Sequence, residues 1–267
     1  MGVLRCIWRM TAILSWMLYD SLICLICCGR GWRGIARATY FSNLWGRGMA
    51  RITGVHIHRH GELGEFTGRL VIANHTGYLD IITLAALTRV RFGSKKEVSK
   101  YPVVGWMLGT SRPVWIDRKN RLAAERTLNE FRDTLKNDIN LLVFPEGTDS
   151  DGVSDLLAFK STAFEAIAET KLPIQPVIIV NRPVNGWNMA WHGVNSPMLP
   201  HALRLLAQKR TDVDVYVLPL QWALDGEDRK ALAMRMHAYM NAAWRTVRGG
   251  DASDSDLDLI YNTPGEK

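Results

Sequence analysis

A histidine and an aspartate five residues apart, His75 and Asp80, are the side chains of this sequence best suited to acid–base chemistry. They lie in "IANHTGYLD", where an apolar, strand-like stretch gives way to a polar cluster. An imidazole can remove a proton near neutral pH, and a carboxylate on its far ring nitrogen fixes the tautomer and stabilises the imidazolium. Gly77 lets the chain turn, so that the two side chains could face each other. The alternative is a helix capped by Thr76, with His75 merely packed.

Two further polar clusters follow apolar, strand-like stretches. In "FPEGTDSDG", Pro145 stops the strand and Glu146 supplies a carboxylate at its end. Gly147 permits close approach of a ligand to the backbone, and Thr148 adds a hydroxyl. An acidic surface turn is the alternative for this stretch. In "VWIDRKNR", Arg118 would present a bidentate fork to a phosphate.

The elements that must position these clusters alternate between strand and helix patterns from Ile52 onward. Strands are predicted in "GVHIHRHG", "RLVIAN", "RPVWID", "INLLVFPEG", "LPIQPVIIV" and "DVDVYVLPLQ". Helices are predicted in "LDIITLAALTRV", "NRLAAERTLNEFRDTLKN", "STAFEAIAET" and "EDRKALAMRMHAYMNAAWRTV". This alternation predicts an α/β fold with a largely parallel sheet flanked by helices. In such sheets ligands collect where strands end and helices begin, which favours one shared site over three isolated turns.

The first 48 residues differ in character from the rest. "CIWRMTAILSWMLYDSLICLICCG" is long enough to cross a bilayer, although Arg9 and Asp20 interrupt it. The mixture of Trp and Arg that follows is typical of a headgroup boundary, and two core helices with snorkelling arginines are the alternative. We predict a membrane-associated helical segment over residues 1–48, spanning or interfacial, an α/β domain over 49–248, and a flexible acidic tail over 249–267.

Composition limits the function classes. Of the 267 residues, 47% are hydrophobic and 22% charged, which excludes wholesale disorder. The formal net charge of +7 suits a partner with negative charge, such as a nucleic acid, an anionic membrane or an acidic carrier protein. All four cysteines precede Gly29, so no disulfide framework staples the body of the chain and a reducing, intracellular location is expected.

Two weaker metal-like patterns are interpreted structurally. The cysteines of "CLICC" stand in an apolar helix without a partner pair, as small apolar residues do. His56, His58 and His60 alternate on one face of a strand, but no carboxylate or Cys joins them within the motif. We therefore expect a basic strand face and no metal site. A P-loop pattern is absent, so nucleotide hydrolysis has no support.

In order and spacing, "NHTGYLD", "WIDR", "FPEGT" and "LPIQPVIIV" together resemble the glycerolipid acyltransferase family that includes 1-acylglycerol-3-phosphate acyltransferases. The resemblance extends from Ile52 to Val180. It implies a membrane-bound enzyme that moves a fatty acyl group from coenzyme A or an acidic acyl carrier protein onto a lysophospholipid hydroxyl. The acceptor it favours is 1-acylglycerol-3-phosphate, giving phosphatidic acid. The acyl donor would be a substrate, and no cofactor is expected.

The same resemblance implies roles for individual residues. His75 would be the general base and Asp80 its orienting carboxylate. The substrate-binding residues would be Asn74, Arg118, Glu146, Gly147 and Thr148. No Ser or Cys in the motif is placed to form a covalent acyl-enzyme, so direct transfer is the expected mechanism. The expected location is the bacterial inner membrane, with the active site facing the cytoplasm.

One departure leaves the acceptor open. After "FPEGT" many family members have arginine, whereas this chain has Asp149 followed by "SDG". This variant and "WHGVNSPMLPH" are similar to a bacterial branch that includes lyso-ornithine lipid acyltransferases, whose acceptor has no phosphate. Arg118 favours a phosphate-bearing acceptor. A non-enzymatic basic protein that binds a membrane or nucleic acid is the alternative from another class, but it leaves "NHTGYLD" and "FPEGT" unexplained, so no nucleic-acid partner is expected.

Overall fold

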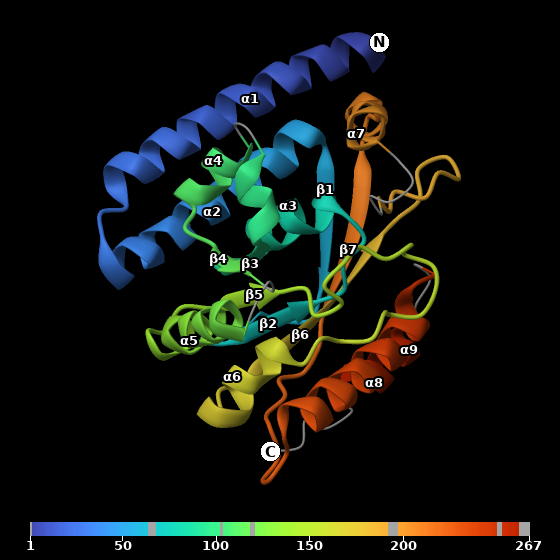
Figure 1. Ribbon diagram of the computed structural model, residues 1–267. Coiled ribbons are helices and arrows are strands. Elements are labelled where there is room, and N and C mark those ends of the chain that lie inside the picture. The colour runs from blue at the N-terminus through green and yellow to red at the C-terminus, as the bar shows by residue number, and fades with distance from the viewer. Residues whose placement is uncertain are drawn as a thin grey trace.

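A computed structural model describes residues 2–63, 68–101, 104–117, 121–191, 197–249 and 253–261. Seven strands form one sheet within these ranges, in the order β1-β7-β6-β2-β5-β3-β4 (Figure 1). The strands are β1 (Val55–His60), β2 (Leu70–Ala73), β3 (Arg91–Lys95), β4 (Val114–Ile116), β5 (Leu141–Val143), β6 (Ile174–Asn181) and β7 (Thr211–Val217).

Five neighbouring strands of the sheet run in one direction. β2 pairs in parallel with β5 and β6, and β3 pairs in parallel with β4 and β5. β7 is antiparallel to β6, and β1 is parallel to β7, so these two run the opposite way. The predicted largely parallel sheet is confirmed, and the carboxyl ends of β2 to β6 meet at one edge.

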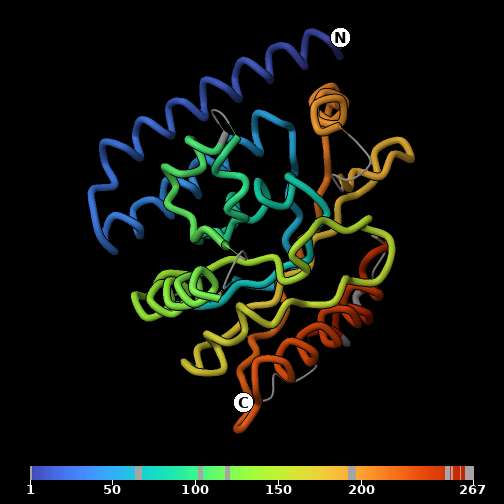
Figure 2. Tube along the Cα trace, viewed as in Figure 1, coloured from blue at the N-terminus to red at the C-terminus, as the bar shows by residue number. Residues whose placement is uncertain are grey.

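Helices cover both faces of the sheet (Figure 1). One face carries α1 (Gly2–Cys27), α2 (Gly31–Thr53), α3 (Tyr78–Leu87), α4 (Val104–Thr110) and α7 (Met198–Ala207). The other carries α5 (Arg121–Lys136), α6 (Thr162–Thr170), α8 (Arg229–Val247) and α9 (Asp254–Tyr261). A 3-10 helix, η1 (Lys96–Lys100), follows β3. In Figure 2, α1 and α9, the first and last helices of the described ranges, lie on opposite sides of the sheet.

The alternation of β2 between the two cores shows why its sequence is apolar throughout. Leu70 and Ile72 pack with the core beneath α5, α6 and α8. Val71 and Ala73 pack with the core beneath α2 and α3. All four side chains are fully buried. A strand covered on both faces has no polar side to show, which is why "LVIA" lacks the period of two.

Helix α2 packs against the α/β domain as well as against α1 of the N-terminal segment. The Nδ2 group of Asn43 donates to the carbonyl oxygens of Ala85 and Ala86, at 2.7 and 3.1 Å, in the last turn of α3. A Cβ at Gly46 would overlap the backbone of Ala86, so only glycine allows this close approach. The predicted boundary at residue 48 therefore falls within α2, where the packing is continuous.

Part of the tail predicted to be flexible forms helix α9. Its start is a reciprocal cap, because the backbone N–H of Ser253 donates to Oδ2 of Asp256 and that of Asp256 donates to Oγ of Ser253. Ile260 is buried in the core beneath α8. The acidic composition of the tail concealed this Ser-x-x-Asp cap and the apolar residues behind it.

Three other elements had no predicted counterpart. β3 has the sequence "RFGSK", α4 is a single short helix and α7 contains a proline. β3 and α4 are short and lack a clear apolar period, whereas α7 has a buried face with Leu205 and Leu206 but carries a proline in its first turn. Arg91 in β3 is buried and donates to the carbonyl oxygen of Arg112 and to the hydroxyl of Thr134, so tertiary contacts stabilise a strand with a charged residue.

Candidate active site

The candidate site forms where β2, β5 and β6 end side by side. β2 is followed by Asn74 and His75, β5 by the loop that contains Glu146 and Asp149, and β6 ends with Asn181. These strands are parallel neighbours, so their carboxyl ends bring together residues about seventy to one hundred positions apart. The long connection from β5 to α6 runs out from this edge in Figure 2.

The predicted pair of His75 and Asp80 is formed. Nδ1 of His75 lies 2.9 Å from Oδ2 of Asp80, which is in the first turn of α3 and fully buried. The imidazole stacks on the ring of Phe144, with centroids 3.9 Å apart and planes 10° from parallel. Stacking and the carboxylate together fix the ring orientation that a general base needs.

The carboxylate of Asp80 is held by several other donors. Its Oδ2 accepts from the backbone N–H groups of Thr76, at 2.6 Å, and Gly77, at 3.0 Å. Its Oδ1 accepts from Nδ2 of Asn181, at 3.0 Å. The hydroxyl of Thr76 also donates to Asp80, so Thr76 does not cap the helix. The carboxylate of Asp80 thus binds both the start of α3 and His75. The capped turn and the histidine–carboxylate pair are therefore formed together and are not alternatives.

A second carboxylate occupies the other ring nitrogen of His75. Nε2 lies 2.9 Å from Oδ1 of Asp149, and the two side chains are 15% and 19% exposed. Burial works to lower the pKa of His75, but hydrogen bonds to Asp149 and Asp80 outweigh it and raise the pKa to about 9. Burial opposes ionisation of Asp149 as well, and the bond to His75 still holds its pKa below the ordinary value. In this state both ring nitrogens donate and His75 is an imidazolium.

Asn74 and Glu146 bind neighbouring backbone groups in this structure, and their predicted role in substrate binding stays a prediction. Asn74 is fully buried, and its amide exchanges two hydrogen bonds with the backbone of Ile179, at 2.7 and 2.9 Å. Glu146 is 2% exposed and accepts from the backbone N–H groups of His75 and Leu157, each at 2.9 Å. Their polar atoms tie the loop after β2 to β6 and to the loop after β5. Burial raises the pKa of Glu146.

The remaining predicted residues stay predictions. Gly147 has φ of 72°, a left-handed conformation that favours glycine, and its N–H donates to the carbonyl oxygen of Phe144 at 3.0 Å. Thr148 is exposed at the tip of the same turn. Arg118 lies outside the described residues. Asp117, which precedes it, follows the carboxyl end of β4, at the edge of the sheet that carries His75.

Two residues that sequence reasoning did not assign to the site complete its frame. Asn181 reaches Asp80 and, at 2.7 Å, the hydroxyl of Thr76. Ser150 donates to the carbonyl oxygen of His75 from its N–H, at 2.7 Å, and from its hydroxyl, at 3.0 Å. The end of the strand "LPIQPVIIV" was the only sequence signal for Asn181. Ser150 had no signal, because a serine in a loop is common.

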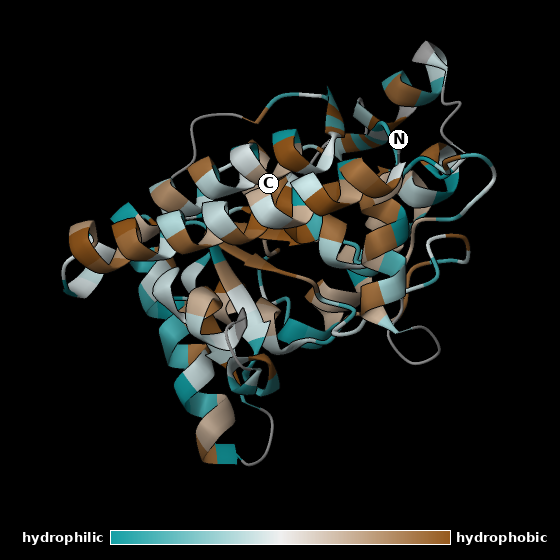
Figure 3. Ribbon diagram, turned by 90° about the horizontal axis from the view of Figure 1, so that it is seen from above, coloured by the Kyte–Doolittle hydropathy of each residue, from teal (hydrophilic) through white to brown (hydrophobic). Residues whose placement is uncertain are grey.

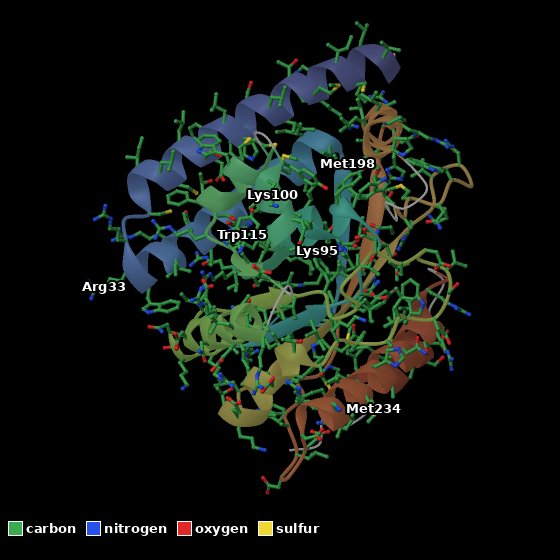
Figure 4. All side chains as sticks on the ribbon, in the orientation of Figure 1. Arg33, Lys95, Lys100, Trp115, Met198 and Met234 are labelled. Atoms are coloured by element: carbon green, nitrogen blue, oxygen red, sulfur yellow. The ribbon has the colours of Figure 1, made fainter. Side chains whose placement is uncertain are left out.

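An apolar cavity of about 390 Å³ lies between the sheet-facing helices and α1. Its lining comes from α1, α2, α3, α4 and α7, and Met198 at the start of α7 is one of the lining residues (Figure 4). Tyr78 and Ile81 of α3, the helix that carries Asp80, also line it. Asp20 is an exception to the apolar lining, and burial raises its pKa to about 7. The volume lies in the range of small-molecule sites, and the lining suits a hydrocarbon chain.

A second, more polar cavity of about 300 Å³ has Phe144 in its lining. Asp117, Pro145 and Lys160 are among the residues that line it, so it lies beside the carboxyl ends of β4 and β5. Phe144 thus takes part both in the stack on His75 and in a pocket that contains an acidic and a basic side chain. Lys160 is a candidate for binding an anionic group, which sequence reasoning did not identify.

Two of the alternating histidines of β1 contact carboxylates of the neighbouring strand. Nε2 of His58 lies 2.6 Å from Asp212, and Nε2 of His60 lies 3.0 Å from Asp214. The carboxylates absent from the motif come from β7, which pairs with β1 in parallel. Across the described part of the chain, no group of three or more His, Cys, Asp or Glu side chains is placed to hold a metal ion.

Fold and site geometry define an α/β enzyme with a histidine–carboxylate centre, and comparison with known proteins gives its family. The family model named Acyltransferase matches residues 54–180. A lyso-ornithine lipid O-acyltransferase of Brucella abortus (strain 2308) is 32% identical over 215 residues, covering 75% of this chain and 80% of the relative. A 1-acyl-sn-glycerol-3-phosphate acyltransferase of Neisseria gonorrhoeae is 28% identical over 191 residues, covering 71% of this chain and 72% of the relative.

A solved structure shares the fold. The 1-acyl-sn-glycerophosphate (LPA) acyltransferase PlsC from Thermotoga maritima superposes with a TM-score of 0.67 at 18% identity, covering 91% of this chain and 95% of that chain. The chain belongs to the acyltransferase family and is an acyltransferase of the lysophospholipid type. Its relatives divide between acceptors with a phosphate and acceptors built on ornithine.

Proposed function

We propose that this enzyme transfers a fatty acyl group from an acyl thioester to the hydroxyl of a lyso-ornithine lipid, with His75 as general base. The observation that carries the chemistry is the 2.9 Å contact between Nδ1 of His75 and the buried carboxylate of Asp80. Because that carboxylate keeps a proton on Nδ1, Nε2 is the nitrogen that can accept one.

The transfer balances without a covalent enzyme intermediate. Nε2 of neutral His75 takes the proton of the acceptor hydroxyl while the oxygen attacks the thioester carbon. The tetrahedral intermediate collapses as the carbon–sulfur bond breaks, and the leaving sulfur takes the proton from the imidazolium. An ester and a free thiol result, and His75 returns to its neutral form. Asp80 stabilises the imidazolium between the two proton transfers.

The ornithine-type acceptor is preferred because of the charge beside the base. Asp149 places a carboxylate 2.9 Å from Nε2, where the acceptor hydroxyl must dock. A phosphate near that hydroxyl would face this carboxylate, whereas the ammonium of an ornithine headgroup would be attracted to it. The relatives from Brucella abortus and Rhodobacter capsulatus, at 32% and 36% identity, carry names with this acceptor.

The second candidate acceptor is 1-acylglycerol-3-phosphate, which the sequence favoured. Lys160 in the polar cavity beside Phe144 supports it, since an ammonium there would attract a phosphate. In the sequence, Arg118 comes two residues after the end of β4. The acyl donor is either an acyl-coenzyme A or an acyl carrier protein. The net charge of +7 favours electrostatic attraction to an acidic carrier.

A membrane-surface location is proposed from the arrangement of α1. By length and composition α1 is the one helix in the described ranges that could cross a membrane. Its Arg9 is buried and donates to the carbonyl oxygens of Leu206 and Gln208 at the end of α7, at 3.1 and 2.6 Å. Asp20 lines the cavity beneath the helix. Both charges that interrupt the apolar run therefore face the protein.

The outer side of α1 is apolar. Its exposed large side chains include Ile7, Leu14, Leu18 and Leu25, and Figure 3 shows hydrophobic residues along the helices on this side of the molecule. A helix with its charges inward and an apolar outer side suits the plane of a membrane interface. We propose that α1 lies in the cytoplasmic face of a bacterial inner membrane, with the cavity beneath it receiving an acyl chain.

The activity is tested with purified full-length protein, a labelled acyl thioester and a panel of lysolipids. We expect labelled ester with lyso-ornithine lipid at a higher kcat/KM than with 1-acylglycerol-3-phosphate. The reverse order would make the phosphate-bearing lipid the acceptor. Absence of labelled ester with every acceptor, from a folded preparation and with both donor types, would contradict the proposed function.

The membrane location is tested by placing charges on the outer side of α1. Leu14→Asp combined with Leu18→Asp should lower binding to anionic vesicles about tenfold or more, because two exposed leucines lose their apolar contact with lipid. Met234→Asp is the matched control, since Met234 is 68% exposed on α8 (Figure 4). Equal vesicle binding by both variants in a flotation assay would contradict an interfacial α1.

A further inference from the structure

We propose that Asp149 is a gate that selects the acceptor: it closes Nε2 of His75 in the empty enzyme, and a cationic group on the acceptor headgroup opens it. The inference rests on the proposed function in that His75 is taken as the base. It adds a residue outside the His75–Asp80 pair, and it names the charge of the headgroup that this site accepts.

The geometry requires that Asp149 move before transfer. A general base needs a free lone pair, and both ring nitrogens of His75 are bound to carboxylate oxygens at 2.9 Å. Asp80 cannot release Nδ1 easily, because it is fully buried and accepts from Thr76, Gly77 and Asn181 as well. Asp149 is therefore the carboxylate that must leave.

The position of Asp149 makes this movement feasible. Its side chain is 19% exposed, against 0% for that of Asp80. It follows Gly147, whose φ of 72° marks a turn, and Thr148, which is exposed. The next residue, Ser150, anchors the loop to the carbonyl oxygen of His75 through two hydrogen bonds. A change of side-chain rotamer at Asp149 would open Nε2 while that anchor holds the loop.

The charges around His75 determine which acceptor can open the gate. Asp80 and Asp149 face the two ring nitrogens, and Glu146 accepts the backbone N–H of His75. Lys95 at the end of β3 (Figure 4) attracts Asp149 and helps to keep its pKa low, yet in this structure Asp149 stays on His75. Three carboxyl groups thus surround the base, so an incoming cation is favoured and an incoming anion is disfavoured.

The opening step conserves protons and charge. The ammonium of the acceptor binds the carboxylate of Asp149, which turns away from Nε2. Without that carboxylate His75 holds its second proton less tightly, and the proton leaves Nε2 to solvent. The acceptor hydroxyl then donates its hydrogen bond to the vacated nitrogen. A headgroup that carries only negative charge cannot draw Asp149 away and leaves His75 protonated.

The kinetic test compares an acceptor whose headgroup carries an ammonium with one whose headgroup carries only negative charge, in charge variants of residue 149. The variants are Asp149→Asn, Asp149→Ser and Asp149→Arg, and the acceptors are lyso-ornithine lipid, 1-acylglycerol-3-phosphate and water, the last followed as thioester hydrolysis. We expect Asp149→Asn and Asp149→Ser to lower the preference for the ammonium-bearing lyso-ornithine lipid about ten- to a hundredfold, the range of one charge-assisted hydrogen bond. Hydrolysis should rise, and Asp149→Arg should reverse the preference.

Asp155→Asn is the matched control, because Asp155 lies in the same connection and forms exposed ion pairs with Arg245 and Arg248. It removes the same charge without contact with His75 and should leave the preference unchanged. An equal loss of rate with all three acceptors in the Asp149 variants would overturn the gate and make Asp149 a positioning residue for the imidazole. Unchanged rates with all three would overturn it as well.

A second measurement does not depend on acyl transfer. The ring nitrogens of His75 are followed by NMR in 15N-histidine-labelled protein, with His75→Ala to assign the signals. Without an acyl donor, lyso-ornithine lipid should lower the pKa of His75 in the wild type, and 1-acylglycerol-3-phosphate should not. In Asp149→Asn the pKa should already be lower without a lipid. If the pKa of His75 changes as expected but no ester forms, the gate stands and the proposed function fails. If lyso-ornithine lipid leaves the pKa of His75 unchanged, the gate is overturned.

Discussion

The carboxylates of Asp80 and Asp214 are both fully buried, and each binds a histidine at nearly the same distance, 2.9 Å for His75 and 3.0 Å for His60. Both imidazoles also stack on an aromatic ring, His75 on Phe144 and His60 on Tyr216, at 3.9 and 4.4 Å between centroids. Locally the two pairs are almost interchangeable. Their positions in the sheet and the other partners of the carboxylates are what differ.

Asp214 is neutralised by a cation within the strand layer. The guanidinium of Arg182 binds both carboxylate oxygens of Asp214. The His60–Asp214 pair lies between the neighbouring strands β1 and β7. Burial works to raise the pKa of Asp214, but Arg182 and His60 hold it below the ordinary value. Asp80 instead receives N–H, hydroxyl and amide donors, at the edge where β2, β5 and β6 end. A short His–Asp contact therefore does not identify a general base by itself. The histidine must also lie where the strands end, and the ion-pair partner of its other ring nitrogen must be able to leave.

The largest contrast is expected from removing the two histidines. His75→Ala should lower kcat about a hundred- to ten-thousandfold, because the acceptor hydroxyl loses its general base. His60→Ala should leave kcat within about twofold, since its ring serves only an ion pair in the sheet. Acyl transfer is measured on both variants after circular dichroism has shown native folding. Transfer by His75→Ala at the wild-type rate would place the base elsewhere.

The two aspartates should separate catalysis from stability. Asp80→Asn should lower kcat about a hundredfold or more, since an amide cannot hold the protonated Nδ1 as a carboxylate does. Asp214→Asn should leave kcat unchanged and lower the free energy of unfolding by about 1–3 kcal/mol, because Arg182 loses its charged partner. Urea unfolding and rate are measured on the same preparations. A loss of rate in Asp214→Asn equal to that in Asp80→Asn would remove the distinction between the pairs.

The doubly bound state of His75 should appear in the pH dependence of stability. The pKa of His75 rises from 6.5 to about 9 on folding, so its contribution is complete below about pH 6.5 and is lost as the pH rises through 9. The difference in unfolding free energy between wild type and His75→Gln should therefore shrink across this interval. In an Asp149→Asn background the same difference should shrink at lower pH. A difference that stays constant from pH 6 to 9.5 would mean that His75 is not doubly bound in solution.

The smallest effect is expected at the exposed ion pair beside the second histidine pair. Asp212 binds His58 and Arg210, and the side chains of Arg210 and Asp212 are 50% and 27% exposed. Asp212→Asn should lower the unfolding free energy by only about 0–1 kcal/mol, because solvent screens such pairs, and should leave acyl transfer unchanged. A loss of several kcal/mol would show that these pairs act as one coupled network with Asp214.

Much of the fold follows from local patterns in the chain. "LVIA" and "PVIIV" are continuous apolar runs because β2 and β6 are buried on both faces, and this continuity predicts central parallel strands. The antiparallel direction of β7 was not predictable in the same way. "DVDVYVLPLQ" alternates in either direction, and the direction depends on how α7 and its connections return the chain to the sheet edge.

The site likewise contains local contacts, which the sequence predicts, and tertiary contacts, which it does not. His75 and Asp80 are five residues apart across one strand-to-helix turn, so their contact is local and the sequence alone determined it. The contacts of Asn74 with Ile179 and of Glu146 with Leu157 were not predictable, because a polar residue after a strand can point to a ligand or to the backbone of a neighbour. The structure shows the backbone contacts, and the neighbours that these side chains meet depend on the strand order.

The sequence by itself determined the α/β class, the clustering of polar residues after strands and the contact between His75 and Asp80. Each depends on periodicity or on a spacing of a few residues, which the backbone converts directly into geometry. The tertiary structure alone decided that Asp149, 74 positions after His75 in the sequence, binds Nε2 of His75. The pairing of β2 with β5 sets that contact, because it places one loop beside the other. The sequence shows that residue 149 carries a negative charge, and the fold places this charge beside His75.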